Sequence, residues 1–488
     1  MDRQNLTLLT DLYELTMMQG YFRNENANQT VIFDMFYRTN PLESGYAIMA
    51  GLEQMIQYIK ELRFDKEDID YLRSVGIFGE DFLEYLKNFR FTGSIWSIPE
   101  GEVIFPREPL VKVIAPIMQA QLVETAILNI INHQSLIATK TSRVCYAARG
   151  DGIMEFGLRR AQGPDAGTYG ARAAMIGGCI GTSNVLAGQL FNVPVKGTNA
   201  HSWVMSFPDE LTAFRKYAEI YPDACLLIAD TYDSLKSGVP NAIKVFQEMR
   251  DKGIHPKLYG VRFDSGDLAY LSKKARKMFD EAGFPDAVIS ASNDLDEFLI
   301  DSLKVQGAQI TSWGVGTNLI TSKDWPAFGG VYKLAAIQDE KGEFVPKIKL
   351  SENSVKVTNP GNKKIVRVYD EEGKVKADLI CLVEEEFSEK EELMLFDPQE
   401  PWKKTWLKPG EFTLREIMIQ VFDEGECVYT SPTVMEMRDF CQKELATLWD
   451  ETRRLVNPHN VYVDLSQKLY DTKIALLNEM SVAGKKFS

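Results

Sequence analysis

The residues best suited to chemistry lie in the middle of the chain, where short apolar runs end in polar side chains. Residues 258–267 form the clearest example, because strand periodicity places Arg262 and Asp264 on one face, opposite Val261 and Phe263. An unpaired charge at the end of an apolar strand is costly. The two side chains therefore either pair with each other or bind a polar ligand, and the sequence leaves both options open.

The segment that follows, residues 264–267, opens a predicted helix with the sequence Asp-Ser-Gly-Asp. Free N–H groups at the start of a helix attract anions, but two aspartates beside a phosphate would need Mg²⁺ or a ribose hydroxyl between them. Capping of the helix explains Asp264 and Asp267 equally well.

Two later runs end in small residues, at positions 290–294 and 313–318. Small residues let backbone N–H groups approach a phosphate closely, and the last strand–helix loops of a barrel commonly form a phosphate site. The sequence has no G-x-x-x-x-G-K-[ST] segment, so a conventional P-loop for ATP is excluded.

An arginine pair and a histidine also follow apolar runs. Arg159 and Arg160 lie in glycine-rich sequence after residues 152–157, where a surface turn is the plain alternative to a binding role. His201 follows residues 193–198, and a lone histidine is commonly structural. If it shares a rim with Arg159 and Arg262, it is a candidate for proton transfer or for accepting a phosphoryl group.

Strand-like runs alternate with helical patterns from residue 119 to about residue 333, at a spacing of roughly thirty residues. The runs are residues 152–157, 193–198, 225–230, 258–264, 287–293 and 310–317. Helices are predicted over residues 209–220, 240–251, 267–282 and 294–306, with Gly253, Gly283 and Gly307 after the last three. This alternation predicts parallel strands in a (β/α) barrel, with a doubly wound open sheet as the alternative.

The segments before and after this region do not show the regular alternation of strands and helices. The first contains a predicted helix at 8–22, a strand at 30–38, two helices between 51 and 89, and a turn-rich β layer at 92–116. The last contains strands within 347–382, an acidic surface stretch at 384–392, and helices at 434–453 and 466–479. We therefore expect three parts, with boundaries at 1–118, 119–345 and 346–488.

The composition is that of a folded protein. Of 488 residues, 45% are hydrophobic and 25% are charged, which argues against a disordered, collagenous or coiled-coil chain. The 55 Lys and Arg against 69 Asp and Glu give a net charge of −14, so we expect neither nucleic acid nor a membrane as partner. No signal sequence or membrane-spanning run is present, which predicts a soluble cytoplasmic protein. Six scattered cysteines and four scattered histidines indicate neither a disulfide framework nor a zinc site.

Five segments in order resemble the nicotinate phosphoribosyltransferase family: residues 10–17, 156–163, 197–202, 261–268 and 314–317. Residues 329–334 and 349–351 continue the similarity. The resemblance implies an α/β fold of the type II phosphoribosyltransferase kind, in which an irregular (β/α) barrel is flanked by an α+β domain built from the N- and C-terminal segments. It also implies a homodimer.

The reaction implied by this resemblance joins nicotinate to 5-phosphoribosyl 1-pyrophosphate, giving nicotinate mononucleotide and pyrophosphate. The family couples this step of NAD salvage to ATP hydrolysis through a phosphohistidine, as an ADP-forming ligase, with Mg²⁺ as cofactor. Relatives that use nicotinamide or quinolinate on the same architecture are the alternative, and a catalytically silent barrel that senses NAD precursors is a third.

The resemblance also assigns roles to single residues. His201 would carry the phosphoryl group, and Asp264 and Asp267 would act with it at the reacting centre. The expected nicotinate contacts are Tyr13, Thr198, Arg262, Arg159 and Phe156, and the expected phosphoribosyl pyrophosphate contacts are Thr317, Gly316, Gly314, Ser292 and Asn293. These residue types suit the chemistry, because a guanidinium binds a planar carboxylate bidentately and an aromatic ring can stack on a pyridine.

Overall fold

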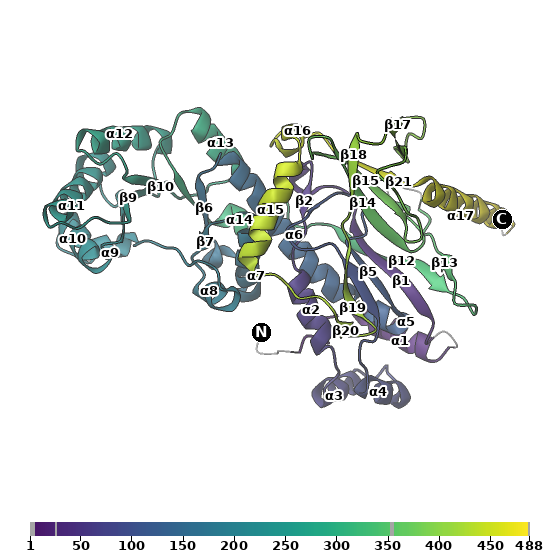
Figure 1. The fold of residues 1–488 in the computed structure, drawn as a ribbon. Helices are drawn as coiled ribbons and strands as arrows, with labels where there is room; N and C mark the ends of the chain where they lie inside the picture. The colour runs from purple at the N-terminus through teal and green to yellow at the C-terminus, as the bar shows by residue number, and fades with distance from the viewer. Residues whose placement is uncertain (1–4, 25–26, 352–355, 487–488) are drawn as a thin grey trace. The chain divides into compact units, whose positions relative to one another are not determined.

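The computed structural model describes residues 5–24, 27–351 and 356–486. These residues form two compact units (Figure 1). The first comprises Met1–Leu136, Ala327–Pro432 and Phe440–Ser488, and the second comprises Ile137–Pro326 and Thr433–Asp439. Within the described ranges, no helix is both long enough and apolar enough to cross a membrane.

The second unit is built on a parallel sheet of six strands in the order β7-β6-β11-β10-β9-β8, which curls into a half-barrel (Figure 1). The strands are β6 (Gly152–Glu155), β7 (Gly181–Thr182), β8 (Ala224–Ile228), β9 (Leu258–Phe263), β10 (Val288–Ala291) and β11 (Ser312–Val315). Helices connect successive strands, as the alternating pattern predicts. The prediction of a (β/α) barrel-like domain is confirmed, and the alternative of a flat doubly wound sheet is not needed.

One of the six predicted strands is wrong. Residues 193–198 form no regular strand; Val195 makes an isolated bridge to Thr182 of β7. The bridge is held by two backbone hydrogen bonds, from Thr182 N to Pro194 O at 3.0 Å and from Lys196 N to Thr182 O at 2.9 Å. Pro194 has no N–H group to extend the ladder, and Val195 is exposed, so the apolar run does not mark a core strand.

Side chains cap the first turns of helices in this unit, and these caps explain where the helices begin. In α12 (Leu268–Glu281), the Asp267 side chain accepts a hydrogen bond from Tyr270 N at 2.9 Å. In α13 (Glu297–Val305), Asp296 caps the helix by accepting from Leu299 N at 2.8 Å, so the helix begins later than predicted. Gly283, which follows α12, has a φ of +79°, the left-handed conformation that favours glycine after a helix.

The other helices of the second unit follow the strands in chain order. They are α7 (Pro164–Ile176), α8 (Val185–Phe191), α9 (His201–Met205), α10 (Glu210–Ile220), α11 (Val239–Asp251) and the short α14 (Thr317–Ile320). Two further helices, α6 (Glu124–Ala147) and α15 (Val434–Thr447), contribute residues to both units.

The first unit contains a seven-stranded sheet in the order β13-β12-β1-β5-β3-β19-β20. Its strands are β1 (Thr30–Tyr37), β3 (Ser94–Ser97), β5 (Val111–Pro116), β12 (Gly330–Gln338), β13 (Phe344–Pro346), β19 (Ile419–Asp423) and β20 (Glu426–Cys427). Because β3 pairs with β19, strands from the N- and C-terminal segments of the chain share one sheet. The expectation of a flanking domain built from N- and C-terminal segments is confirmed.

A second sheet of this unit has the order β18-β14-β15-β21, and two further two-stranded pairs, β16-β17 and β2-β4, are present. The strands are β14 (Lys363–Asp370), β15 (Val375–Leu382), β18 (Phe412–Glu416), β21 (Tyr462–Leu465), β2 (Ala47–Ile48), β4 (Val103–Ile104), β16 (Leu393–Phe396) and β17 (Lys404–Leu407).

The helices of the first unit are α1 (Leu12–Phe22), α2 (Leu52–Glu61), α3 (Lys66–Val75), α4 (Glu80–Lys87), α5 (Ile117–Leu122), α16 (Asp450–Arg453) and α17 (Gln467–Lys486). Three helices, not the predicted two, lie between residues 51 and 89. The extra break follows from a capping box of Asp65 and Asp68 at the start of α3 and from Gly76, with a φ of +79°, at its end.

A buried charge network lies within the first unit. Arg367 of β14 is fully buried and donates to both carboxylate oxygens of Asp378 on β15, at 2.8 and 2.7 Å. It also donates to Glu102, which pairs with Arg415 at 2.9 Å. Arg415 in turn contacts Glu444 at 2.7 Å. Every charge in this network has an opposite partner, which a buried charge requires.

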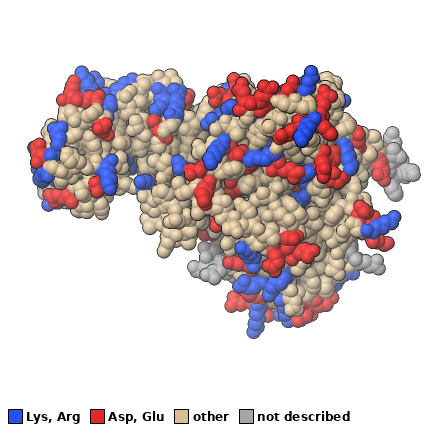
Figure 2. Space-filling view, in the orientation of Figure 1, with Lys and Arg blue, Asp and Glu red and all other residues tan. Residues whose placement is uncertain are grey.

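The surface charge agrees with the sequence composition. On the face shown in Figure 2, acidic and basic side chains are interspersed over both units. Such a surface lacks the single broad basic field that nucleic acid binding favours on this face.

Candidate active site

The carboxyl ends of β8, β9 and β10 bring His201 together with two aspartates. His201 is the first residue of α9, and its side chain is 39% exposed. Its Nδ1 lies 3.1 Å from Thr231 Oγ1, while Nε2 lies 3.9 Å from Asp264 Oδ2 and 4.0 Å from Asp230 Oδ1. An anionic group on Nε2 would therefore need a cation between itself and these two carboxylates.

Asp230 belongs to this site although sequence reasoning missed it. Its side chain is only 2% exposed, and its Oδ2 accepts hydrogen bonds from Asp264 N at 2.8 Å and from Ser265 Oγ at 2.7 Å. Its other oxygen, Oδ1, is buried and has no hydrogen-bond partner in the described structure. The available signal was its place at the end of an apolar run, which matches the place of Asp264 one strand later.

Asp264 connects the histidine to the next strand. Its Oδ1 accepts a hydrogen bond from the hydroxyl of Ser292, which follows β10 and is buried, while its Oδ2 faces His201. The predicted juxtaposition of His201, Asp264 and Ser292 at one sheet edge therefore matches the structure. Asp267 instead caps α12, which is the structural role that the sequence left open for it.

Arg262 does not pair with Asp264, which removes one of the two options that the sequence left open. Its Nη2 donates to the backbone oxygen of Asn199 at 3.0 Å, and its Nε is buried without a partner. The ion pairs within the described ranges do not join Arg262 to either aspartate. Burial lowers the pKa of Arg262, and the nearby charge of Arg159 lowers it further, whereas Asp264 and Asp230 raise it. This arginine therefore has hydrogen-bonding capacity left for a polar ligand.

Phe156 and the glycines of β11 form a second part of this edge. A Cβ atom on Gly314 would lie 2.5 Å from the Phe156 ring, and one on Gly316 would lie 3.3 Å from the Phe156 oxygen. Gly314 is therefore needed for packing of the ring, whatever else it contacts. Arg159 is exposed, and its Nη1 lies 3.5 Å from the Phe156 oxygen.

Glu155 holds the turn that carries Phe156. One of its oxygens accepts from Gly157 N and the other accepts from Thr182 Oγ1 at 2.6 Å, which links the end of β6 to β7. Burial raises the pKa of Glu155, and these two hydrogen bonds oppose that effect. Sequence reasoning missed this residue because a single glutamate inside a motif gives no separate signal.

The remaining predicted residues of the second unit lie on loops or helix starts. Thr198 is half-buried and donates to the backbone oxygen of Asn199 at 3.2 Å. Asn293 is exposed with a φ of +94°, and Thr317 begins α14 directly after Gly316. Tyr13 lies on α1 in the first unit, where its side chain is 48% exposed.

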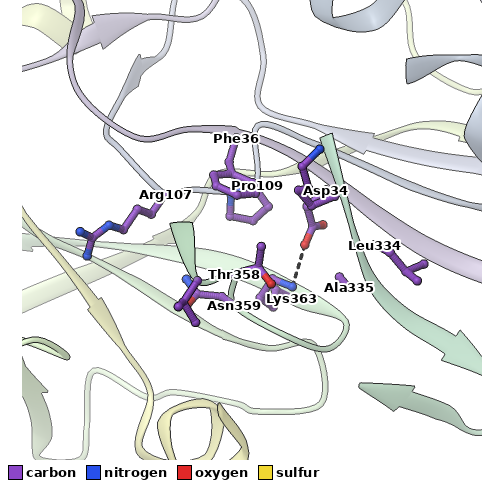
Figure 3. Close-up of a pocket in the computed structure, with 11 residues that line it drawn as sticks. Asp34, Phe36, Arg107, Pro109, Leu334, Ala335, Thr358, Asn359 and Lys363 are labelled. Carbon is purple, nitrogen blue, oxygen red and sulfur yellow. Dashed lines mark ion pairs between the residues drawn. The ribbon is translucent and has the colours of Figure 1, made fainter. Parts of the chain in front are cut away.

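A pocket in the first unit holds a different set of residues (Figure 3). It is lined by Asp34, Arg107, Thr358, Asn359 and Lys363, among others. Lys363 forms a buried ion pair with Asp34 at 2.6 Å, drawn as the dashed line in Figure 3. Since none of the predicted site residues lines this pocket, the edge of the half-barrel is the candidate active site.

Known protein families and known proteins match this chain over nearly its whole length. Family models of nicotinate phosphoribosyltransferase match residues 8–132 (N-terminal domain), 152–370 (the family model itself) and 362–473 (C-terminal domain). A nicotinate phosphoribosyltransferase of Bacillus subtilis is 45% identical over 98% of this chain and 96% of its own length. The one from Homo sapiens is 32% identical over 97% of this chain and 96% of its own.

Solved structures give the same result for the fold. The crystal structure of human nicotinic acid phosphoribosyltransferase superimposes with a TM-score of 0.82 and 30% identity, covering 97% of this chain and all of that one. A nicotinate-nucleotide pyrophosphorylase from Pyrococcus furiosus has a TM-score of 0.69 at 19% identity, over 92% of this chain and 97% of its own, which indicates a shared fold. This chain belongs to the nicotinate phosphoribosyltransferase family.

Proposed function

We propose that this protein joins nicotinate to 5-phosphoribosyl 1-pyrophosphate, forming nicotinate mononucleotide and pyrophosphate in NAD salvage. The observation that carries the proposal is the position of Arg262, a half-buried arginine whose buried Nε is unpaired, at the sheet edge that also carries His201 and Asp264. Nicotinate supplies the planar carboxylate that such a group binds best. Full-length similarity to nicotinate phosphoribosyltransferases supports the same substrate.

Nicotinate has a carboxylate and an aromatic ring, and we propose that different residues bind each of them. Arg262, with Arg159 and the Thr198 hydroxyl, would bind the carboxylate, and the rings of Phe156 and Tyr13 would stack on the pyridine. The pyridine nitrogen then attacks the anomeric carbon of the ribose as the bond to pyrophosphate breaks.

Positive charge develops on the ribose in this step, so a carboxylate nearby lowers the barrier. Asp264 is the proposed carboxylate, with Asp267 in support from the start of α12. The phosphoribosyl group would be bound by Thr317, Gly316, Gly314, Ser292 and Asn293, of which Gly314 lies in β11 and the others follow β10 or β11.

Mg²⁺ fits the oxygen-rich side of this site. Asp230 and Asp264 would hold the ion, because a carboxylate oxygen of each faces His201 and Asp230 Oδ1 lacks a partner. When bound there, Mg²⁺ would supply positive charge for substrate phosphates, which normally complete its coordination. Among the described residues, no three His, Cys, Asp or Glu side chains form a group that could hold a metal ion.

ATP is the proposed co-substrate, with His201 as the acceptor of its γ-phosphoryl group. A bond forms between a ring nitrogen and phosphorus as the bond to ADP breaks, and water later takes the phosphoryl group. The Thr231 hydroxyl restrains the ring at Nδ1 during this exchange. We further propose a homodimer in the cytoplasm as the working form.

The proposal is tested by incubating the protein with nicotinate, phosphoribosyl pyrophosphate, Mg²⁺ and ATP and measuring nicotinate mononucleotide by chromatography. Nicotinamide and quinolinate are added in competition at equal concentration. Preferential conversion of nicotinate is expected, because nicotinamide has no carboxylate for Arg262 and quinolinate brings a second one. Conversion of another pyridine in preference would redirect the assignment, and absence of any product would indicate a silent relative.

Replacement of Arg262 by lysine is expected to weaken nicotinate binding about ten- to a hundredfold, which corresponds to roughly 1.5–3 kcal/mol for lost charged hydrogen bonds. Lysine keeps the charge but cannot donate two parallel hydrogen bonds. The measurement is the KM for nicotinate beside the KM for phosphoribosyl pyrophosphate, which should change little. An unchanged nicotinate KM would exclude Arg262 from the carboxylate site.

A further inference from the structure

Three buried hydrogen-bond donors of the second unit have no partner among the described residues. They are Nδ2 of Asn199, Nε of Arg262 and the hydroxyl group of Ser290. Ser290 is fully buried, and Asn199 is only 8% exposed. Buried polar groups in folded proteins normally have a partner, so each exception needs an explanation. We call these three groups the donor row.

The register of the half-barrel sheet places the donor row across three neighbouring strands. Arg262 of β9 is paired with Ile228 of β8 on one side and with Ser290 of β10 on the other. Asn199 lies over the β8 position, since its Oδ1 accepts a hydrogen bond from Ile228 N at 3.3 Å. Its backbone oxygen also accepts from Arg262 Nη2 at 3.0 Å. Neighbouring strands lie about 4.8 Å apart, so one small ligand can reach all three donors.

The donor row lies on the same face of the sheet as the reacting groups of the candidate site, but deeper. Side chains two residues apart on a strand point to the same face, so Arg262 shares its face with Asp264, and Ser290 shares its face with Ser292. The hydrogen bond from Ser292 to Asp264 joins the two strands at the upper level, which we call the outer layer. The two levels are about 6.6 Å apart along the strands, a length comparable to that of a pyridinecarboxylate.

The chemistry of the donor row suits a carboxylate. The guanidinium is a permanent cation, and the two oxygens of a carboxylate together accept up to four hydrogen bonds, which is enough for all three donors. A carboxamide has a single accepting oxygen and would turn its own N–H groups toward the row, leaving donors that face donors. The outer layer instead holds Asp230 and Asp264, which repel a carboxylate. The row therefore distinguishes an acid from its amide.

We propose that Asn199 and Ser290 are specificity-determining residues that bind the carboxylate of nicotinate together with Arg262. The inference rests on the proposed function and adds two contacts to the arginine. With its carboxylate in the donor row, the substrate directs its ring nitrogen toward the outer layer, where His201 and Asp264 lie. All of these residues belong to the second unit.

The first test compares two fully buried serines of the second unit, Ser290 and Ser272 of α12. The hydroxyl group of Ser272 donates to Ala269 O and accepts from Gln309 N, both at 3.1 Å. Ser290→Ala should raise the KM for nicotinate about tenfold and leave the Tm of the free protein unchanged, because the free protein loses no hydrogen bond. Ser272→Ala should lower the Tm and leave this KM unchanged. A lower Tm with an unchanged KM in Ser290→Ala would overturn the proposal.

The second test changes one donor of the row into an acceptor. Asn199→Asp keeps the oxygen that accepts from Ile228 N, but it places a second carboxylate oxygen where Nδ2 was. Loss of the donor and repulsion of the anionic substrate should together weaken nicotinate binding about a hundredfold. The KM for phosphoribosyl pyrophosphate is the internal control and should change much less. Equal changes in both KM values would exclude a specific role in carboxylate binding.

Calorimetric titration with nicotinate alone separates this inference from the proposed function, because it needs no turnover. Weaker binding in Ser290→Ala than in the wild type is expected. Equal affinity in the two proteins would overturn the inference alone. If the variant binds more weakly but the wild type forms no nicotinate mononucleotide, the carboxylate site is supported and the proposed reaction is wrong. No binding of nicotinate by the wild type would overturn both.

Discussion

Replacing His201 with alanine is expected to abolish transfer of the γ-phosphoryl group of ATP to the protein. The imidazole Nε2 lies 4.0 Å from Asp230 Oδ1 and 3.9 Å from Asp264 Oδ2, the carboxylates of the two proposed Mg²⁺ ligands. Alanine has no atom that can replace the ring nitrogen. The measurement is retention of ³²P from γ-labelled ATP, which should be acid-labile and base-stable in the wild type and absent in His201→Ala.

The matched control for this experiment is His255→Ala, because His255 is an exposed histidine of the same unit. It should be labelled like the wild type. Stimulation of nicotinate mononucleotide formation by ATP should disappear in His201→Ala and persist in the control. Undiminished labelling of His201→Ala would remove this histidine from the mechanism and leave the pyridine-transfer step to be explained without it.

Replacing Arg367 with methionine is expected to destabilise the sheet that contains β14 and β15 by about 3–5 kcal/mol. Methionine fills similar space but leaves Asp378 buried without its cation, while Glu102 keeps only its contact with Arg415. Native-state hydrogen exchange of the β14 and β15 amides measures this loss locally, so it does not require the whole chain to unfold in one step. Arg73→Met, which removes only exposed ion pairs, should leave stability nearly unchanged.

The size of the Arg367→Met effect should depend on pH. Burial acts to raise the pKa of Asp378, but the charge of Arg367 and the hydrogen bonds from Glu108 and Arg367 together lower it. Stability from this aspartate is therefore present above its ordinary value of 3.8 and lost as the pH falls below it. Without Arg367 the acid is held more easily in its protonated form, so the variant should lose more stability at pH 8 than at pH 5. Equal losses at both pH values would mean that the carboxylates do not depend on this arginine.

The pH dependence of Glu102 runs in the other direction. Burial raises its pKa to about 8, against the opposing charges of Arg367 and Arg415. Folding therefore favours the protonated acid, and stability from this residue falls as the pH rises from about 4.5 to about 8. Loss of Arg367 increases this fall, which adds to the larger destabilisation expected at pH 8.

The sequence predicted the half-barrel well because its strands are buried on both faces. The run at 225–230, for example, corresponds to β8 (Ala224–Ile228), since a buried parallel strand is apolar along its whole length. The strand β7 was missed because it has only two residues, Gly181 and Thr182, and carries no apolar run. Residues 193–198 were apolar enough to suggest a strand, but Pro194 and an exposed Val195 make them a bridging segment.

The sequence predicted those site residues whose own side-chain type indicates the chemistry. It did not predict the groups to which these side chains are hydrogen-bonded. His201 and Asp264 were identified because parallel strands place their carboxyl ends at one edge. The partner of Arg262 is a backbone oxygen, that of Asn199, and no side-chain pattern signals a backbone partner.

The bridge at Val195 affects the solubility of the protein as well as its activity. The open edges of a sheet invite pairing with other chains, which leads to aggregation. Lys196 and Pro194 cover the edge at β7, and Asn199 accepts from Ile228 N at 3.3 Å on the edge at β8. His201 belongs to the same short stretch. A substitution that detaches this stretch from the sheet would therefore expose unpaired strand edges and also displace the histidine. Selection against aggregation and selection for turnover therefore act on the same residues, which restricts how freely this stretch can evolve.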